Sequence, residues 1–94
     1  MPNYAAEVYT RGTDRDVAGL AGAATSACRD LAAEGIAVRH LSSVLMPRDE
    51  ICIHLFDAAS PSIVEEVGRR AGLAFSRITE AVTTPIEGGE EEAR

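Results

Sequence analysis

The stretch "DEICIHLFDAASP" at residues 49–61 decides the fold, because it joins a strand to a helix. Residues 50–56 are mostly Ile, Leu and other residues that favour strands. Ser60 and Pro61 then predict a helix start, since proline at the first helical position loses no intrahelical bond and serine can accept from the exposed amides. The stretch therefore predicts a strand that runs directly into a helix.

The sequence on either side of this stretch extends the pattern. "MPRD" at 46–49 supplies a tight turn, so that residues 36–46, rich in Val, Leu and Ser, form a hairpin with the strand that follows. Downstream, the helix has an apolar stripe and should stop at Gly72. Residues 77–83, "RITEAVT", predict a last strand before Pro85.

The first third of the chain repeats the alternation of strand and helix. Residues 4–10, "YAAEVYT", predict a strand, and the helix after it should begin at Thr13 and end at Gly35. Its apolar residues recur every three or four positions, which is one face of a helix: Val17, Leu20, Ala24, Cys28 and Leu31.

The resulting order of elements, β-α-β-β-α-β, predicts an α+β fold of the ferredoxin-like class. This is a four-stranded antiparallel sheet with two helices on one face, in a single domain over residues 1–86. The tail at 87–94 is acidic, without apolar periodicity, and is expected to be disordered.

The two helices cover only one face of such a sheet, so the second face must be polar, form a pocket or be covered by a second subunit. The strand from 50 to 56 carries apolar residues at both parities, with Ile51, Ile53 and Leu55 on one side. We therefore expect that face to be at least partly buried, most simply in a face-to-face or edge-sharing homodimer.

Composition excludes several classes of function. The chain of 94 residues has a net charge of -6 and no basic run, which argues against nucleic acid as a partner. No apolar stretch reaches the roughly 20 residues of a membrane span, and the first 20 residues do not resemble a signal peptide. The two cysteines form no regular framework. A cytoplasmic, reduced protein without membrane contact is expected.

Cys52 and His54 stand at strand positions that would ordinarily hold Val or Leu. Residues two apart leave the same face of a strand, separated by roughly 6 to 7 Å. Both types bind transition metals if a neighbouring strand supplies further ligands, and His40 is the candidate. For Cys52 alone, a small buried hydrophobe is the better interpretation, whereas His54 can equally be a buried imidazole with hydrogen-bond partners.

The face on which His40 lies depends on the register of the hairpin. If Ser42 pairs with His54, the two imidazoles share a face, whereas pairing of Leu41 with His54 turns His40 away. A four-residue loop favours the second pairing and a bulge would restore the first, so both stay open.

Glu7 and Glu80 lie in strands that should be neighbours, which makes them candidates for acid-base chemistry or metal ligation, or simply solvated side chains. No nucleophile elbow, phosphate loop, CxxC pair or HExxH motif is present.

Residues 47–82 resemble a small ferredoxin-like family of largely unknown function that includes a nickel-binding protein. The resemblance begins with an acidic turn at Asp49 and Glu50 and a strand that carries Cys52. An aromatic-acid-Ala step at 56–58 then leads into a helix that starts at Ser60. It ends with "RAGL" at 70–73 and the last strand at 77–82. The resemblance implies a homodimer that binds nickel or a similar divalent ion through His, Cys and carboxylate groups. His54 and His40 depart from the family pattern, in which Cys or an aromatic residue is usual at the first position and an aromatic at the second.

Three functions therefore stay open. The first is divalent-metal binding by His54, His40 and Cys52, with Glu7 or Glu80 completing or orienting the shell. The second is a cofactor-independent enzyme or small-molecule binder of the dimeric α+β barrel type. Its pocket would lie on the second sheet face around His40, His54, Tyr9 and Arg39, with a histidine as general base. The third is a structural dimerising module.

Overall fold

The computed structural model describes residues 1–10 and 14–84. In chain order its elements are β1 (Asn3–Tyr9), α1 (Asp14–Ala33), β2 (Val38–Met46), β3 (Ile51–Ala58), α2 (Pro61–Ala71) and β4 (Arg77–Ala81). Each predicted strand and helix is present, with bounds that differ by a few residues. The expected helix cap at Thr13 and the acidic tail at 87–94 lie outside the described residues.

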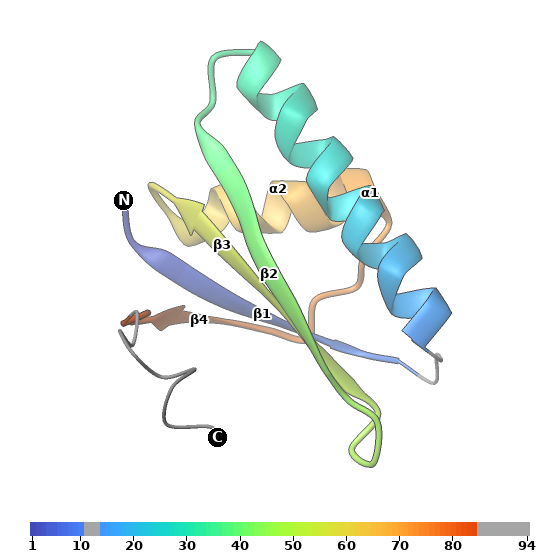
Figure 1. Cartoon of the computed structure of the whole chain (residues 1–94). Helices are drawn as coiled ribbons and strands as arrows, with labels where there is room; N and C mark the ends of the chain where they lie inside the picture. Colours follow the sequence, from blue (N-terminus) through green and yellow to red (C-terminus); the bar gives the residue numbers. More distant parts are fainter. Residues whose placement is uncertain (11–13, 85–94) are drawn as a thin grey trace, which may run out of the picture.

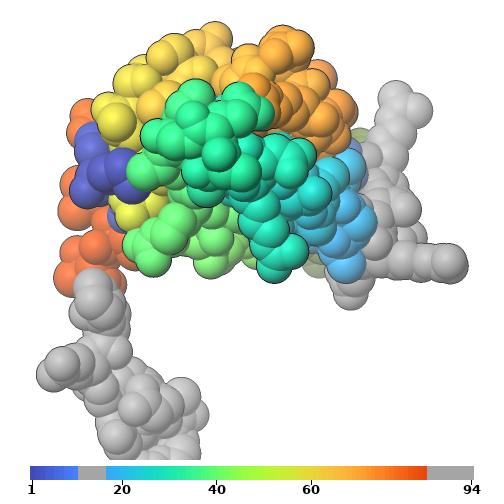
Figure 2. Space-filling view, turned by 90° about the horizontal axis from the view of Figure 1, so that it is seen from above, coloured from blue at the N-terminus to red at the C-terminus, as the bar shows by residue number. Residues whose placement is uncertain are grey.

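The strands form one antiparallel sheet in the order β2-β3-β1-β4, with β2 and β4 at its edges. Both helices lie on the same side of this sheet (Figure 1). They contact one another and are seen side by side in the space-filling view (Figure 2). The predicted α+β, ferredoxin-like fold is confirmed. Neither helix is long and apolar enough to cross a membrane, as judged over the described residues.

The core lies between the sheet and the two helices. Alternate residues of the central strands face the helices and are buried, as the period of two in a strand requires. The buried residues of the two strands are Tyr4, Ala6, Val8, Cys52, His54, Phe56 and Ala58. The helices meet them with the stripe expected from the sequence, which includes Ala24, Cys28 and Leu31 on α1, and with Val64 and Val67 on α2. Many of these side chains are small, as the scarcity of aromatic residues in the sequence requires.

The two ends of α2 match the sequence signals to different degrees. Gly72 adopts the left-handed conformation at φ 72°, and the Leu73 amide donates to the Gly68 carbonyl at 2.8 Å. The helix stop is thus the expected glycine C-cap. At the start, Pro61 is in the first turn, but the Ser60 side chain makes no capping bond. Its hydroxyl lies 2.9 Å from that of Ser62 instead, so the expected acceptance from the helix amides does not occur.

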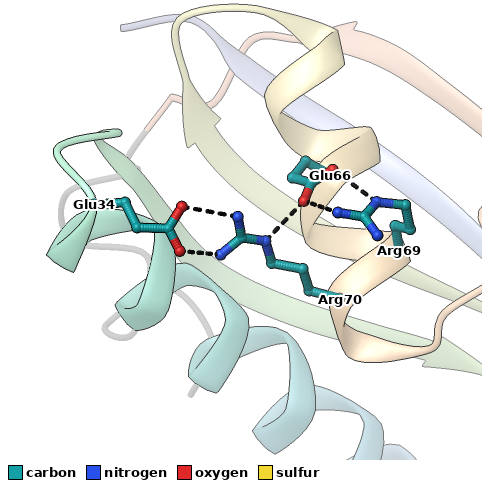
Figure 3. A network of polar contacts seen from close by, with 4 residues as sticks. All are labelled: Glu34, Glu66, Arg69 and Arg70. Atoms are coloured by element: carbon teal, nitrogen blue, oxygen red, sulfur yellow. Dashed lines mark hydrogen bonds and ion pairs between the residues drawn. The ribbon is translucent and has the colours of Figure 1, made fainter.

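A surface network of charges fastens the end of α1 to α2 (Figure 3). Arg70 donates to Glu34 at 2.9 Å and to Glu66 at 2.7 Å, and Arg69 also donates to Glu66. The hydrogen bonds from Arg69 and Arg70 lower the pKa of Glu66 to about 2. Exposed pairs of this kind contribute little individually. Together they connect the end of α1 to α2.

The face of the sheet opposite the helices has no cover within the described chain. Ile51, Ile53 and Leu55 of β3 are half-buried there, and Val44 of β2 is 48% exposed. Tyr9 at the end of β1 belongs to the same face and is 72% exposed. The β3 part of this open face is apolar, as the two-sided pattern of β3 indicated, whereas Glu7 of β1 lies opposite Ile53.

Candidate functional site

A bulge in β2 brings the two histidines to the same face of the sheet. The four-residue loop at 47–50 sets a register that by itself would turn His40 away from His54. In this register Ser43 lies opposite His54. An extra residue, Leu41, then interrupts the ladder, so that His40 lies opposite Phe56. Neither pairing considered from the sequence forms. The bulge nevertheless has the expected effect, because the ring centroids of the histidines are 5.6 Å apart.

A chain of hydrogen bonds runs from α1 through both histidines. Thr25 Oγ1 lies 3.0 Å from His40 Nδ1, and His40 Nε2 lies 2.9 Å from Ser43 Oγ and 3.1 Å from the Ser42 carbonyl. Ser43 Oγ is in turn 2.6 Å from His54 Nδ1. Residues of α1, β2 and β3 are thereby connected through their side chains.

One arrangement of protons gives each of these four contacts a donor and an acceptor and uses both hydroxyl protons. A carbonyl only accepts, so His40 Nε2 carries a proton, and His40 Nδ1 accepts from the Thr25 hydroxyl. Ser43 accepts from His40 and donates to His54 Nδ1. The proton of His54 then lies on Nε2, a buried atom that has no hydrogen-bond partner among the described residues.

Both imidazoles are held in their neutral form. Burial, and to a smaller extent the positive charge that His40 would carry, lower the pKa of His54 to about 4. Burial also lowers the pKa of His40, against opposing contributions from the backbone carbonyls of Ser42 and Ala21. Near pH 7 the chain of hydrogen bonds therefore contains two neutral imidazole rings.

His40 also forms part of a groove between α1 and the edge strand β2. The groove has a volume of about 340 Å³, and its lining is mostly apolar. Its lining residues are Thr25, Cys28, Arg29, Ala32, Val38, Arg39 and His40. This volume is at the lower end of the roughly 300–1,000 Å³ of small-molecule sites. One small organic molecule fits the space.

The charged groups of the groove are two arginines. Arg39 donates to Asp57 at 3.0 Å, and the side chain of Asp57 is only 14% exposed. Arg29 makes no ion pair within residues 1–10 and 14–84. Cys28 lies at the wall as a thiol, because burial raises its pKa to about 11. The groove therefore offers positive charge and no ready nucleophile.

The metal-ligand candidates do not converge on one point. Cys52 is fully buried on the same face of β3 as His54, and burial raises its pKa. Glu7 belongs to the open face, 3.9 Å from Arg77, and Glu80 lies on β4. No cluster of three or more His, Cys, Asp or Glu side chains suited to a metal occurs in the described part of the chain. The described residues thus supply an imidazole pair and not a complete nickel shell.

The four residues expected to share a pocket are divided between two faces. His40 and His54 lie under the helices, whereas Tyr9 and Arg39 are at positions of the open face. The alternation of side chains along each strand separates them. Arg39 is at the edge strand, so its side chain still reaches the rim of the groove.

Sequence reasoning missed the contribution of α1 to the groove. Thr25, Cys28, Arg29 and Ala32 are spaced i, i+3, i+4 and i+7, which places them along one stripe of the helix. This stripe adjoins the buried one that the apolar periodicity revealed. The spacing was visible in the sequence, but nothing there indicated that the stripe would border the edge of β2.

Comparison with known proteins agrees with the fold. Neither a family model nor a curated protein matches the sequence. Among solved structures, the chain is similar to SCO4226 from Streptomyces coelicolor A3(2), with a TM-score of 0.74 and 16% sequence identity. The similarity covers 88% of this chain and 99% of that one. At this identity the likeness concerns the fold alone.

Proposed function

We propose that the protein binds a small organic molecule in the groove between α1 and β2, and that it does so as a homodimer of the dimeric α+β barrel type. The observation that carries the proposal is the mostly apolar groove of about 340 Å³ with His40 in its wall. Sites for small molecules combine such an apolar lining with a few fixed polar groups. The two free, buried cysteines support the expected cytoplasmic location.

The hydrogen bonds of His40 support a binding role. Thr25 holds one ring nitrogen and Ser42 and Ser43 hold the other, so the ring is fixed before any ligand arrives. Because this side chain is already ordered, ligand binding costs no conformational entropy at His40. The His40 ring is thus a preformed part of the groove wall. The hydrogen bonds through Ser43 to the buried His54 hold the ring in this orientation.

The open face of the sheet supports the homodimer. Ile51, Ile53 and Leu55 lie together on the central strand β3, next to Val44 of β2. A contiguous apolar surface on a sheet is typical of an interface. The occupant we propose is the same face of a second copy, as in an isologous dimer. The groove lies on the other side of the sheet and stays accessible in such a dimer.

Filling the groove tests the binding site. We expect Ala32→Trp to abolish binding of two-ring aromatic probes, because Ala32 lines the groove and the indole would occupy its space. The probes are 2-naphthoate, 2-naphthamide and 2-naphthylmethylamine, and binding is measured by isothermal titration calorimetry.

Ala33→Trp is the matched control, since Ala33 is the next residue of α1, is exposed and does not line the groove. It should bind as the parent does. The proposal fails if no probe binds the parent protein, or if both tryptophan variants bind equally well.

Binding of nickel or a similar divalent ion is a second candidate. The observation that favours it is the imidazole pair of His40 and His54, together with the unpartnered Nε2 of His54. Cys52 on the same face is a further potential donor, whereas Glu7 and Glu80 lie elsewhere on the sheet.

Elemental analysis of untagged protein tests this second candidate. One nickel per chain is expected in the parent after incubation with the ion and removal of excess, and none in His54→Ala. Equal nickel content in the two proteins would exclude His54 as a ligand.

A further inference from the structure

We infer that the ligand of the groove is a small organic monoanion, a carboxylic acid with a flat apolar body, whose carboxylate is bound by Arg29. The inference rests on the proposed function, because it names the ligand class of the same groove. It assigns the apolar body to the wall formed by Cys28, Ala32 and Val38.

The distribution of charge carries this assignment. The whole chain has a net charge of -6, yet the lining of the groove includes two arginines and no aspartate or glutamate. Positive groups gathered in a concave, mostly apolar surface attract anions more strongly than the same groups on a flat one. An anionic ligand is therefore favoured at this place in an otherwise acidic protein.

The two arginines are not equivalent. Arg39 already donates to Asp57, so part of its charge is offset. Arg29 has no ion pair among the described residues. A guanidinium presents paired N–H donors that match the two oxygens of a carboxylate. Arg29 is consequently the anchor, and Arg39 adds to the field.

The surroundings of the anchor favour a carboxylate over a phosphate. A phosphate carries up to two charges and three acceptor oxygens, which call for several donors. Here one unpaired guanidinium stands beside a mostly apolar wall. Thr25 and His40 are hydrogen-bonded to each other, so these groups are not available as further donors to a phosphate. A single carboxylate on an apolar body matches this set of groups.

The test compares an acid with its neutral isostere. We expect 2-naphthoate to bind the parent more tightly than 2-naphthamide, and Arg29→Gln to weaken 2-naphthoate about tenfold, the size of effect expected for a hydrogen bond to a charged group. Binding of 2-naphthamide should be the same in Arg29→Gln and the parent. Affinities are measured by isothermal titration calorimetry at low salt.

Arg48→Gln is the matched control, because Arg48 is exposed in the loop between β2 and β3 and does not line the groove. It removes the same charge from the chain and should bind 2-naphthoate as the parent does. Equal binding of the acid and the amide, with no effect of Arg29→Gln, would overturn the carboxylate assignment and leave the groove as a binding site. Absence of binding by either probe would overturn both.

Discussion

Acidification from about pH 7.5 to about pH 5 is expected to lower the free energy of unfolding by about 2 kcal/mol through His54 alone. Burial lowers the pKa of His54 from 6.5 to about 4 in the folded protein. Above pH 6.5 the His54 ring is neutral in both the folded and the unfolded state, so its ionisation does not change the free energy of unfolding. Between pH 6.5 and about 4 the unfolded chain binds a proton that the folded chain excludes, and stability is lost as the pH falls.

Urea unfolding across this pH range measures the effect. His54→Leu removes the titrating group while keeping an apolar side chain at the buried position, and its stability should fall less steeply with decreasing pH. A smaller dependence in the same direction should persist, because burial also lowers the pKa of His40. Parallel pH dependences in the parent and His54→Leu would contradict the assignment of a neutral, buried His54.

A charge at the centre of the open face is expected to dissociate the homodimer. Ile53 is a half-buried residue of β3 on the open face, and Ile53→Arg would place a longer, charged side chain in the proposed interface, opposite Glu7 of β1. Removing such a charge from water is strongly unfavourable, so the dissociation constant should increase by at least about 100-fold. Native mass spectrometry should then find a dimer of the 9.9 kDa chain for the parent and a monomer for the variant.

Ala33→Arg, with the same change of charge at an exposed position of α1, is the control and should remain dimeric. Circular dichroism of both variants establishes that each is folded. A parent protein that is monomeric at micromolar concentration, or an Ile53→Arg variant that stays dimeric, would contradict the proposed interface.

The fold could be predicted from the sequence because its signals are local. Pro61 and Gly72 mark the ends of α2 through their own backbone preferences, and the spacing of Leu20, Ala24 and Leu31 depends on one helix alone. Each signal needs only residues nearby in the chain. The order of elements then leaves few arrangements of the sheet.

The candidate site could be predicted only in part because it depends on contacts between elements. His40 and His54 were recognised as a potential pair, but their common face is due to the bulge at Leu41, and no residue type there signals a bulge. Likewise, Arg29 borders the groove because α1 lies along the edge strand β2. How a helix sits over a sheet edge is set by packing, which local patterns do not encode.

The central claim is that the groove between α1 and β2 is a ligand site, and chemical-shift mapping tests it most directly. Titration of ¹⁵N-labelled protein with 2-naphthoate should shift the backbone amides of Thr25, Arg29 and His40 in proportion to its occupancy. Amides of the open face, such as those of Tyr9 and Ile53, should stay in place. Shifts confined to the open face, or no shifts at millimolar probe, would contradict the claim.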